Sequence, residues 1–217
     1  MKKKILVLLA VVTLLFGCKN VKGESKYSKQ ALTNNKIGYT QEVISGKLIE
    51  FKDLEDLEGQ TENIIRVRKI KELESVPWDG PDAADVEPGF ESGTTMSEAE
   101  VLEVFKGSLQ EGEKIRVEED FFRNDVSKKI FSVEGYTAMN DGEEYLLLLN
   151  KNEDYYYIVG VLPGQIPLIN PIKGNVVKGT NSSRNVAEEA GTSVIINTNF
   201  PEEIQNLQIQ IVDKYIK

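Results

Sequence analysis

Two runs of mainly apolar residues, separated by a short polar break, occupy the middle of the chain between Ala99 and Glu119. Both runs are rich in β-branched, aromatic and aliphatic residues, and the break contains Gly107 and Gly112. This pattern is typical of two strands joined by a short loop. The sequence therefore predicts a β-hairpin, and the strands predicted on both sides of it would complete a small β domain.

The first arm of this hairpin changes its apolar face midway. In a regular strand Ala99 and Val101 would point to one side, whereas Leu102 and Val104 would point to the other. A β-bulge adds one residue to a strand and so redirects the side chains that follow it. A bulge near Val101 or Leu102 would direct both pairs to one core, as a closed or nearly closed small barrel requires.

Further strands are predicted from other apolar runs. Glu144 to Leu149 is almost wholly apolar and follows the turn dipeptide Asp141-Gly142, which is typical of a buried strand. The other candidate strands are residues 37–51 with a kink or bulge at Gly46, 63–73, 131–135, 154–162 and 194–196, with a polar turn at 52–61. The expected fold class is therefore mainly β, with the strands forming a small antiparallel barrel.

The last residues of the chain have a helical period instead. Asn199 and Glu202 form a start that resembles a capping box. The apolar residues that follow recur at helical spacing, namely Ile204, Leu207, Ile211, Val212 and Tyr215. We predict a C-terminal amphipathic helix that packs on its own domain rather than on a partner.

The first 18 residues have the pattern of an export signal. A cationic start, Met1-Lys2-Lys3-Lys4, precedes an apolar run from Ile5 to Phe16 that is shorter than the roughly 20 residues of a membrane-spanning helix. Leu15-Phe16-Gly17-Cys18 resembles the bacterial lipobox, in which the cysteine becomes the lipidated first residue of the mature protein. Cys18 is the only cysteine, so an intramolecular disulfide is excluded. We predict lipidation of Cys18 and attachment to the outer face of the cell membrane.

The predicted organisation has four parts. Residues 1–17 are the signal peptide, 18–36 a lipidated flexible tether, 37–170 the barrel domain, and 171–217 a linker, a short strand and the C-terminal helix. Removing the signal peptide lowers the basic residues from 26 to 23 against 35 acidic ones, so the mature chain carries a charge near −12. Such a charge repels phosphate backbones, and nucleic acid is not an expected partner.

An acidic segment between Glu72 and Glu91 contains seven acids, three prolines and no basic residue. It is predicted to be a long exposed loop, a kind of segment that is often functional or disordered. A calcium site is the alternative to a solvated loop, but the spacing of the acids matches no EF-hand pattern. Trp78 is the only tryptophan in the chain and lies inside this segment. The residues predicted to contact a protein partner are Trp78, Asp79, Asp82 and Asp85.

Several kinds of chemistry are excluded by composition. The chain contains no histidine, so Ser-His-Asp, Cys-His and histidine-based metal sites are excluded. Glycine-rich phosphate loops are also lacking, and no cofactor is expected. A carboxylate pair is the remaining catalytic possibility, since Glu118 and Asp120 share one face of an extended strand. The alternative interpretation is that these two acids only form a charged, solvent-exposed surface at the end of a strand.

Aromatic residues offer a second candidate surface. Barrels of this size often bind ligands across one open face and its loops, and tyrosine combines apolar area with a polar tip. The aromatic residues considered are Phe121, Phe122, Tyr136, Tyr155, Tyr156 and Tyr157. Their alternative role is to fill the barrel or to be covered by the terminal helix.

The chain resembles netrin-like domains, the OB-type barrels found in tissue inhibitors of metalloproteinases, in netrin C-termini and in bacterial surface lipoproteins. The resemblance lies in Glu98 to Gly107, in Ile115-Arg116-Val117 and in Asp141 to Leu148, and it covers about residues 37–170. It implies an OB-like barrel but no catalytic residue. The inhibitor members use disulfides and a free amino-terminal cysteine, whereas the only cysteine here is predicted to be acylated.

The function expected from these features is non-enzymatic. A lipoprotein of a Gram-positive bacterium, held at the membrane by the lipid on Cys18, would act as a binding or structural module for a protein at the cell surface. Two other classes stay open: an inhibitor of a secreted or surface enzyme, and a carboxylate-dependent hydrolase. Two carboxyl groups facing each other in a cleft would favour the hydrolase.

Overall fold

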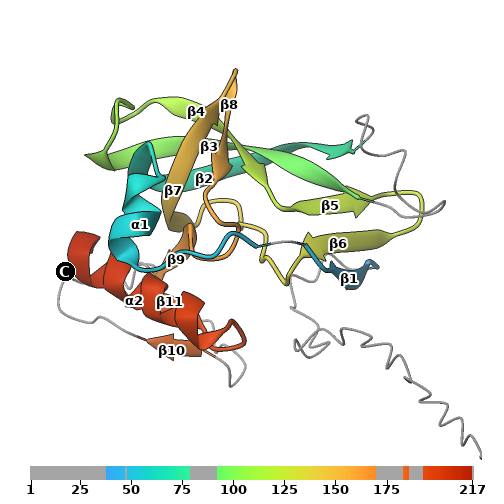
Figure 1. The fold of residues 1–217 in the computed structure, drawn as a ribbon. Helices are drawn as coiled ribbons and strands as arrows, with labels where there is room; N and C mark the ends of the chain where they lie inside the picture. Colours follow the sequence, from blue (N-terminus) through green and yellow to red (C-terminus); the bar gives the residue numbers. More distant parts are fainter. Residues whose placement is uncertain (1–37, 47, 79–91, 170–182, 186–192, 217) are drawn as a thin grey trace, which may run out of the picture.

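The computed structural model describes residues 38–46, 48–78, 92–169, 183–185 and 193–216, and these residues form a mainly β fold with two helices (Figure 1). The predicted signal peptide and tether, Cys18 included, lie outside the described residues, as do Asp79, Asp82 and Asp85. In chain order the elements are β1 (Thr40–Ile44), α1 (Leu54–Gly59), β2 (Asn63–Pro77), β3 (Gly93–Lys106), β4 (Lys114–Glu119), β5 (Phe121–Asn124), β6 (Lys129–Val133), β7 (Glu144–Asn152), β8 (Tyr155–Ile158), β9 (Gln165–Ile169), β10 (Ser183–Asn185), β11 (Ser193–Asn197) and α2 (Glu202–Tyr215).

Five strands close into a ring. The order is β7, β2, β3, β4 and β8, and β8 pairs with β7 again. Four of these pairings are antiparallel, but β4 and β8 run parallel, with Val117 opposite Tyr156 and Glu118 opposite Tyr157. The mainly β prediction is confirmed, whereas a wholly antiparallel arrangement is wrong. A parallel pair needs a long crossover connection, and β5, β6 and β7 provide one between β4 and β8.

The predicted central hairpin consists of β3 and β4. Its ladder runs from Thr95 opposite Glu119 to Glu100 opposite Lys114. On the other side of β3 the pairing with β2 passes from Glu103 directly to Val101, so Leu102 has no partner there and forms the predicted bulge. Ala99 and Val101 are fully buried, and Val104 packs against the same core.

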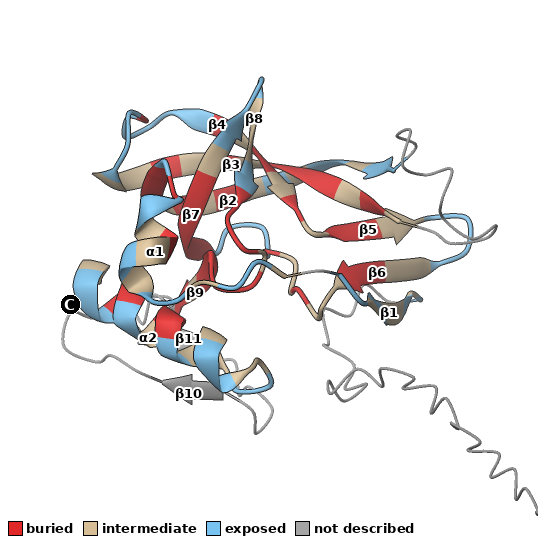
Figure 2. Cartoon of the chain, viewed as in Figure 1, coloured by how far each residue is buried: buried red, intermediate tan, exposed pale blue. Residues whose placement is uncertain are grey.

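Both faces of the central strands β2 and β7 are covered, which explains the apolar sequence of β7. Ile65 and Leu147 belong to the cluster inside the ring, whereas Ile64 and Leu148 belong to a second cluster outside it. Full burial of such a side chain stabilises the fold by about 1.5–3 kcal/mol. Helix α2 covers the outer cluster and contributes its buried residues Ile211 and Val212 to it (Figure 2). The prediction that this helix packs on its own domain is confirmed.

Residues 52–61 are not the predicted polar turn. They contain helix α1, which begins after Asp53, whose Oδ1 accepts a hydrogen bond from the backbone N–H of Asp56 at 2.9 Å. This is an ordinary N-cap. Leu57 is fully buried in the outer cluster, and Glu58 accepts hydrogen bonds from Lys214 and Tyr215 of α2, each at 2.7 Å. Contact with α2 thus stabilises a helix of only six residues.

The long hairpin of β2 and β3 extends past the ring. The segment predicted as a loop from Glu72 is partly strand, because β2 continues to Pro77 and β3 begins at Gly93. A separate small sheet has the order β1, β6, β5, with β1 and β6 parallel. Strand β1 is shorter than the predicted 37–51, and Gly46 lies beyond its end. Strands β9, β11 and β10 extend the main sheet from β7.

Candidate functional site

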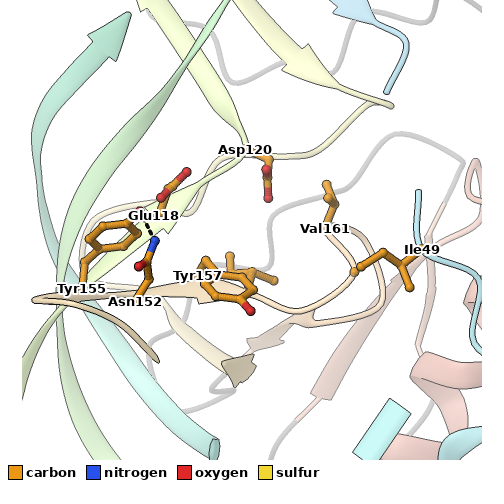
Figure 3. A pocket seen from close by; sticks show the side chains of 9 residues that line it. Ile49, Glu118, Asp120, Asn152, Tyr155, Tyr157 and Val161 are labelled. Atoms are coloured by element: carbon orange, nitrogen blue, oxygen red, sulfur yellow. Dashed lines mark hydrogen bonds between the residues drawn. The ribbon is translucent and has the colours of Figure 1, made fainter. Parts of the chain in front are cut away.

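Three consecutive acids at the end of β4 point in two directions. Strand alternation sends every second side chain to the same face. Val117 and Glu119 are fully buried, whereas Glu118 and Asp120 line an open pocket on the other side (Figure 3). The shared face that the sequence predicted for Glu118 and Asp120 is confirmed.

Glu119 forms the centre of a buried polar network. Lys69 Nζ donates a hydrogen bond to Glu119 Oε1 at 2.9 Å, and Ser97 Oγ donates to the same oxygen. Glu119 Oε2 accepts from the Tyr136 hydroxyl at 3.1 Å and from the backbone N–H of Met139 at 2.7 Å. A buried ion pair is tolerated when its remaining hydrogen-bonding capacity is met, as it is here. We therefore assign Glu119 a structural role.

The β4–β8 pocket, as we call it, has a volume of about 310 Å³. Its walls come from β4, the turn after it, the end of β7, β8 with the residues that follow, and the segment before α1. Its lining residues are Ile49, Glu118, Asp120, Asn152, Tyr155, Tyr157, Ile158, Gly160 and Val161. The parallel pairing of β4 and β8 brings Tyr157 opposite Glu118 and thereby builds the pocket. Ligand pockets start at about this size.

The two carboxyl groups of the pocket bind protons more tightly than free carboxyls. Burial raises the pKa of Asp120 to about 7, and the neighbouring charges of Glu118 and Glu119 add to the effect. Among the described residues, none donates a hydrogen bond to the Asp120 carboxyl. Burial also raises the pKa of Glu118, although hydrogen bonds from Tyr155 and Thr94 oppose that rise. The pocket therefore presents a carboxyl that has no hydrogen-bond donor among the described side chains.

The candidate aromatic residues divide into two groups. Tyr155 and Tyr157 line the β4–β8 pocket, and Tyr155 accepts a hydrogen bond from Asn152 Nδ2 at 2.5 Å (Figure 3). Tyr156 packs instead against the core inside the ring. The other three are buried and take the structural role, namely Phe121, Phe122 and Tyr136.

Trp78 lies directly after β2, at the outer end of the β2–β3 hairpin. Its backbone N–H donates to the carbonyl of Ser92 at 2.9 Å, and 54% of the residue is exposed. Leu73 and Val76 on the same strand are 41% and 39% exposed. Strand β7 pairs with β2 only as far as Arg68, so beyond Lys69 the described part of the chain provides a ladder partner for β2 on one side alone. We call Leu73, Val76 and Trp78 the hairpin tip.

The described acidic residues near the hairpin tip form ion pairs. Glu72 forms an ion pair with Arg123, and Glu74 lies 3.4 Å from Arg116. Most of the acidic segment from Glu72 to Glu91, for which a calcium site was the alternative to a solvated loop, falls outside the described residues. Within the described ranges, no group of three or more His, Cys, Asp or Glu residues could hold a metal ion.

Comparison with known proteins finds no matching family model, no match among curated proteins and no match among solved structures. In the part of the chain that the structure describes, no helix is both long and apolar enough to cross a membrane.

The sequence identified several pocket residues individually, but it did not indicate that they lie close together in the fold. Alternation along β4 identified Glu118 and Asp120, and Tyr155 and Tyr157 were among the candidate aromatic residues. Ile49, Asn152 and Val161 were missed, because their roles depend on how distant segments pack. Asn152 is the last residue of β7 and lies beside a polar turn, and such turns are too common in protein sequences to identify a binding residue.

Proposed function

We propose that this protein is a lipid-anchored, non-enzymatic binding module on the outer face of a bacterial cell membrane, and that the hairpin tip contacts a protein partner. The observation that carries this proposal is the exposure of Trp78 at the outer end of the longest hairpin. Binding energy at protein interfaces concentrates in a few residues, and tryptophan is one of the residue types enriched among them.

The surroundings of Trp78 suit a protein partner better than a small ligand. Leu73 and Val76 add exposed apolar area on the same strand. The edge of β2 that no described strand pairs with beyond Lys69 offers backbone donors and acceptors to which an extended segment of another chain can pair. The mature chain also has an acidic excess, which attracts a basic surface and speeds its association. The acidic residues Asp79, Asp82 and Asp85 follow Trp78 in the sequence and belong to the proposed contact region.

Attachment to the membrane completes the proposal. A lipid on Cys18 followed by a polar tether over residues 18–36 would hold the folded part about 25 Å from the membrane surface, if the tether behaves as a flexible coil. That distance leaves room for a partner between the protein and the membrane. The charge of the mature chain disfavours direct electrostatic binding to anionic headgroups, so the acyl chains would provide the attachment.

We also propose that the ring of strands is an OB-like barrel of the netrin-like type. Support comes from the five strands of the ring and its closure by β7 and β8, since OB-type barrels are five-stranded. Inhibition of a secreted or surface enzyme would be one form of the proposed binding. The hairpin tip rather than a free cysteine would then make the contact.

The test is capture of envelope proteins on the immobilised mature chain, with Trp78→Ala and Tyr157→Ala variants in parallel. We expect a partner that is retained at low salt, weakened at high salt, and lost or at least tenfold depleted with Trp78→Ala, because the anchor side chain is removed. Tyr157→Ala is the matched control, since it removes a 40% exposed aromatic residue elsewhere on the surface. An unchanged captured set with Trp78→Ala would contradict the proposal.

A carboxylate-dependent hydrolase is the second candidate, and the carboxyl groups of Glu118 and Asp120 in one pocket favour it. Acid–base pairs work best when their environments push the two pKa values apart. Here the pKa values of Glu118 and Asp120 are both raised, so neither group is held as a low-pKa carboxylate. Binding is therefore the better-supported function. If the protein hydrolysed a glycoside or ester substrate and Glu118→Gln abolished that activity, hydrolysis would become the better-supported function.

A further inference from the structure

We propose that the β4–β8 pocket binds a small organic cation, a primary amine in its ammonium form, with the ammonium group at Asp120 and the carbon chain between the tyrosines and the apolar wall. This inference does not depend on the protein-binding role of the hairpin tip. It rests on the charge, the hydrogen-bonding state and the wall composition of the pocket.

The charge of the pocket is one-sided. Glu118 and Asp120 supply two carboxyl groups, and neither lysine nor arginine is among the described residues that line it. Glu119 lies behind them, but its charge is already matched by Lys69. Asp120 therefore faces a neighbouring acid without a compensating cation. A bound ammonium group would neutralise that charge, and opposite charges attract more strongly in a partly dehydrated pocket than in water.

Hydrogen bonding points to the same class of ligand. The Asp120 carboxyl accepts no hydrogen bond from the described residues, whereas Glu118 is already engaged by Tyr155 and Thr94. A carboxylate is a pure acceptor, and an ammonium group carries three donors and no acceptor. The two groups are complementary. A phosphate or a carboxylate ligand would bring further acceptors and further negative charge, and the pocket would repel it.

The walls of the pocket favour an organic cation over a hydrated metal ion. Tyr155 and Tyr157 present aromatic rings, and the apolar residues Ile49 and Val161 lie on the side of the pocket away from Glu118 (Figure 3). Aromatic rings attract cations through their faces, and apolar side chains pack against a carbon chain. Calcium takes six to eight oxygen ligands. Two carboxyl groups and the amide of Asn152 supply fewer than that, and the aromatic and apolar walls cannot contribute.

The experiment measures binding of two probes of equal length, n-butylammonium chloride and n-butanol, to the mature chain by calorimetry at pH 8. We expect n-butylammonium to bind at least tenfold more tightly than n-butanol, because only the cation can pair with Asp120. Asp120→Asn should weaken n-butylammonium binding at least tenfold, and Tyr157→Ala should weaken it severalfold. Glu111→Gln is the charge-matched control, since it removes an exposed acid in the β3–β4 loop, and it should bind as the parent does.

Three results would overturn the inference. They are equal affinity for the two probes, absence of n-butylammonium binding at millimolar concentration, and tighter binding of calcium chloride than of n-butylammonium. Far-ultraviolet circular dichroism of each variant separates lost binding from lost folding, and Glu118→Gln provides a second pocket variant should Asp120→Asn be misfolded. Trp78→Ala should bind n-butylammonium normally. A failure of the hairpin-tip proposal and a failure of this one therefore give different results.

Discussion

At the scale of single residues, Glu118, Glu119 and Asp120 show how position alone gives three adjacent acids different properties. Glu119 is buried but accepts four hydrogen bonds, one of them from Lys69, so its charge is stabilised inside the ring. Asp120 is partly buried without such partners, and the pKa of its carboxyl rises to about 7. A poorly solvated, unpaired carboxyl lowers stability and is a typical feature of a functional site.

Asp120 should make the stability of the protein depend on pH. In the unfolded chain its pKa is near 3.8, whereas in the folded state burial and the charges of Glu118 and Glu119 raise it to about 7. The folded state then binds the proton more tightly, so stability falls as the pH rises from about 4 to about 7 and stays low above that. Among the pocket residues, the other titratable groups that face Asp120 are Glu118, Tyr155 and Tyr157.

Replacement of Asp120 by Asn should remove the loss of stability that Asp120 causes as the pH rises. We expect Asp120→Asn to be more stable than the parent at pH 8 by about 1–3 kcal/mol, allowing for the contact of the pocket with water, and to be nearly equal to it at pH 4. Urea denaturation at the two pH values measures the difference. Equal free energies of unfolding for the two proteins at pH 8 would show that Asp120 is well solvated or paired.

At the scale of elements, sequence patterns predicted the features that depend on residues close together in the chain. The hairpin of β3 and β4 and the bulge at Leu102 followed from the apolar positions, because the side-chain direction in a strand changes with every residue. The burial of β7 followed from its run of leucines. Helix α1 was missed, because its two leucines lie in a polar segment and its stability comes from packing on α2.

The pocket shows why the candidate site could be predicted only in part. Which side chains share a face is a local property, and the predicted shared face of Glu118 and Asp120 is present in the structure. The pairing of β4 with β8 is long-range and parallel, and no turn signal marks such a pair. The contribution of Ile49 depends on the packing of a segment that has no strand or helix of its own. The predicted contact residues Asp79, Asp82 and Asp85 lie outside the described residues.

Helix α2 should be an integral part of the fold rather than an appendage. Ile211 is fully buried against the outer cluster, so Ile211→Ala removes buried apolar area and leaves a cavity. We expect a loss of about 2–5 kcal/mol in the free energy of unfolding, in a single cooperative transition. Gln210→Ala, at the exposed neighbouring position, should change stability by less than about 0.5 kcal/mol. An Ile211→Ala protein as stable as the Gln210→Ala protein would mean that the helix does not support the ring.

At the scale of the whole molecule, the proposed functions use two separate surfaces of one fold. The hairpin tip extends past the ring at the end of β2, whereas the β4–β8 pocket lies where β4 meets β8. In both regions, groups lack a partner among the described residues. At the tip these are exposed apolar side chains and a strand edge, and in the pocket it is the Asp120 carboxyl group. The outer face of the membrane is where the N-terminal sequence would place both surfaces.

The lipid on Cys18 is the prediction on which that location depends. The cationic start, the apolar run that ends at Phe16 and the lipobox-like Leu15-Phe16-Gly17-Cys18 all favour acylation of this residue. Cells fed an alkyne fatty acid should therefore label the parent protein and leave Cys18→Ala unlabelled, and the parent alone should stay with the membrane fraction after a high-salt wash. A single acyl chain holds a protein only weakly and reversibly, whereas the two or more chains of a bacterial lipoprotein give stable attachment, so salt should not release the parent. Equal labelling of the two proteins would show that Cys18 is not the lipid site. Retention of Cys18→Ala in the washed membranes would show instead that another contact, such as the proposed partner of the hairpin tip, holds the protein there.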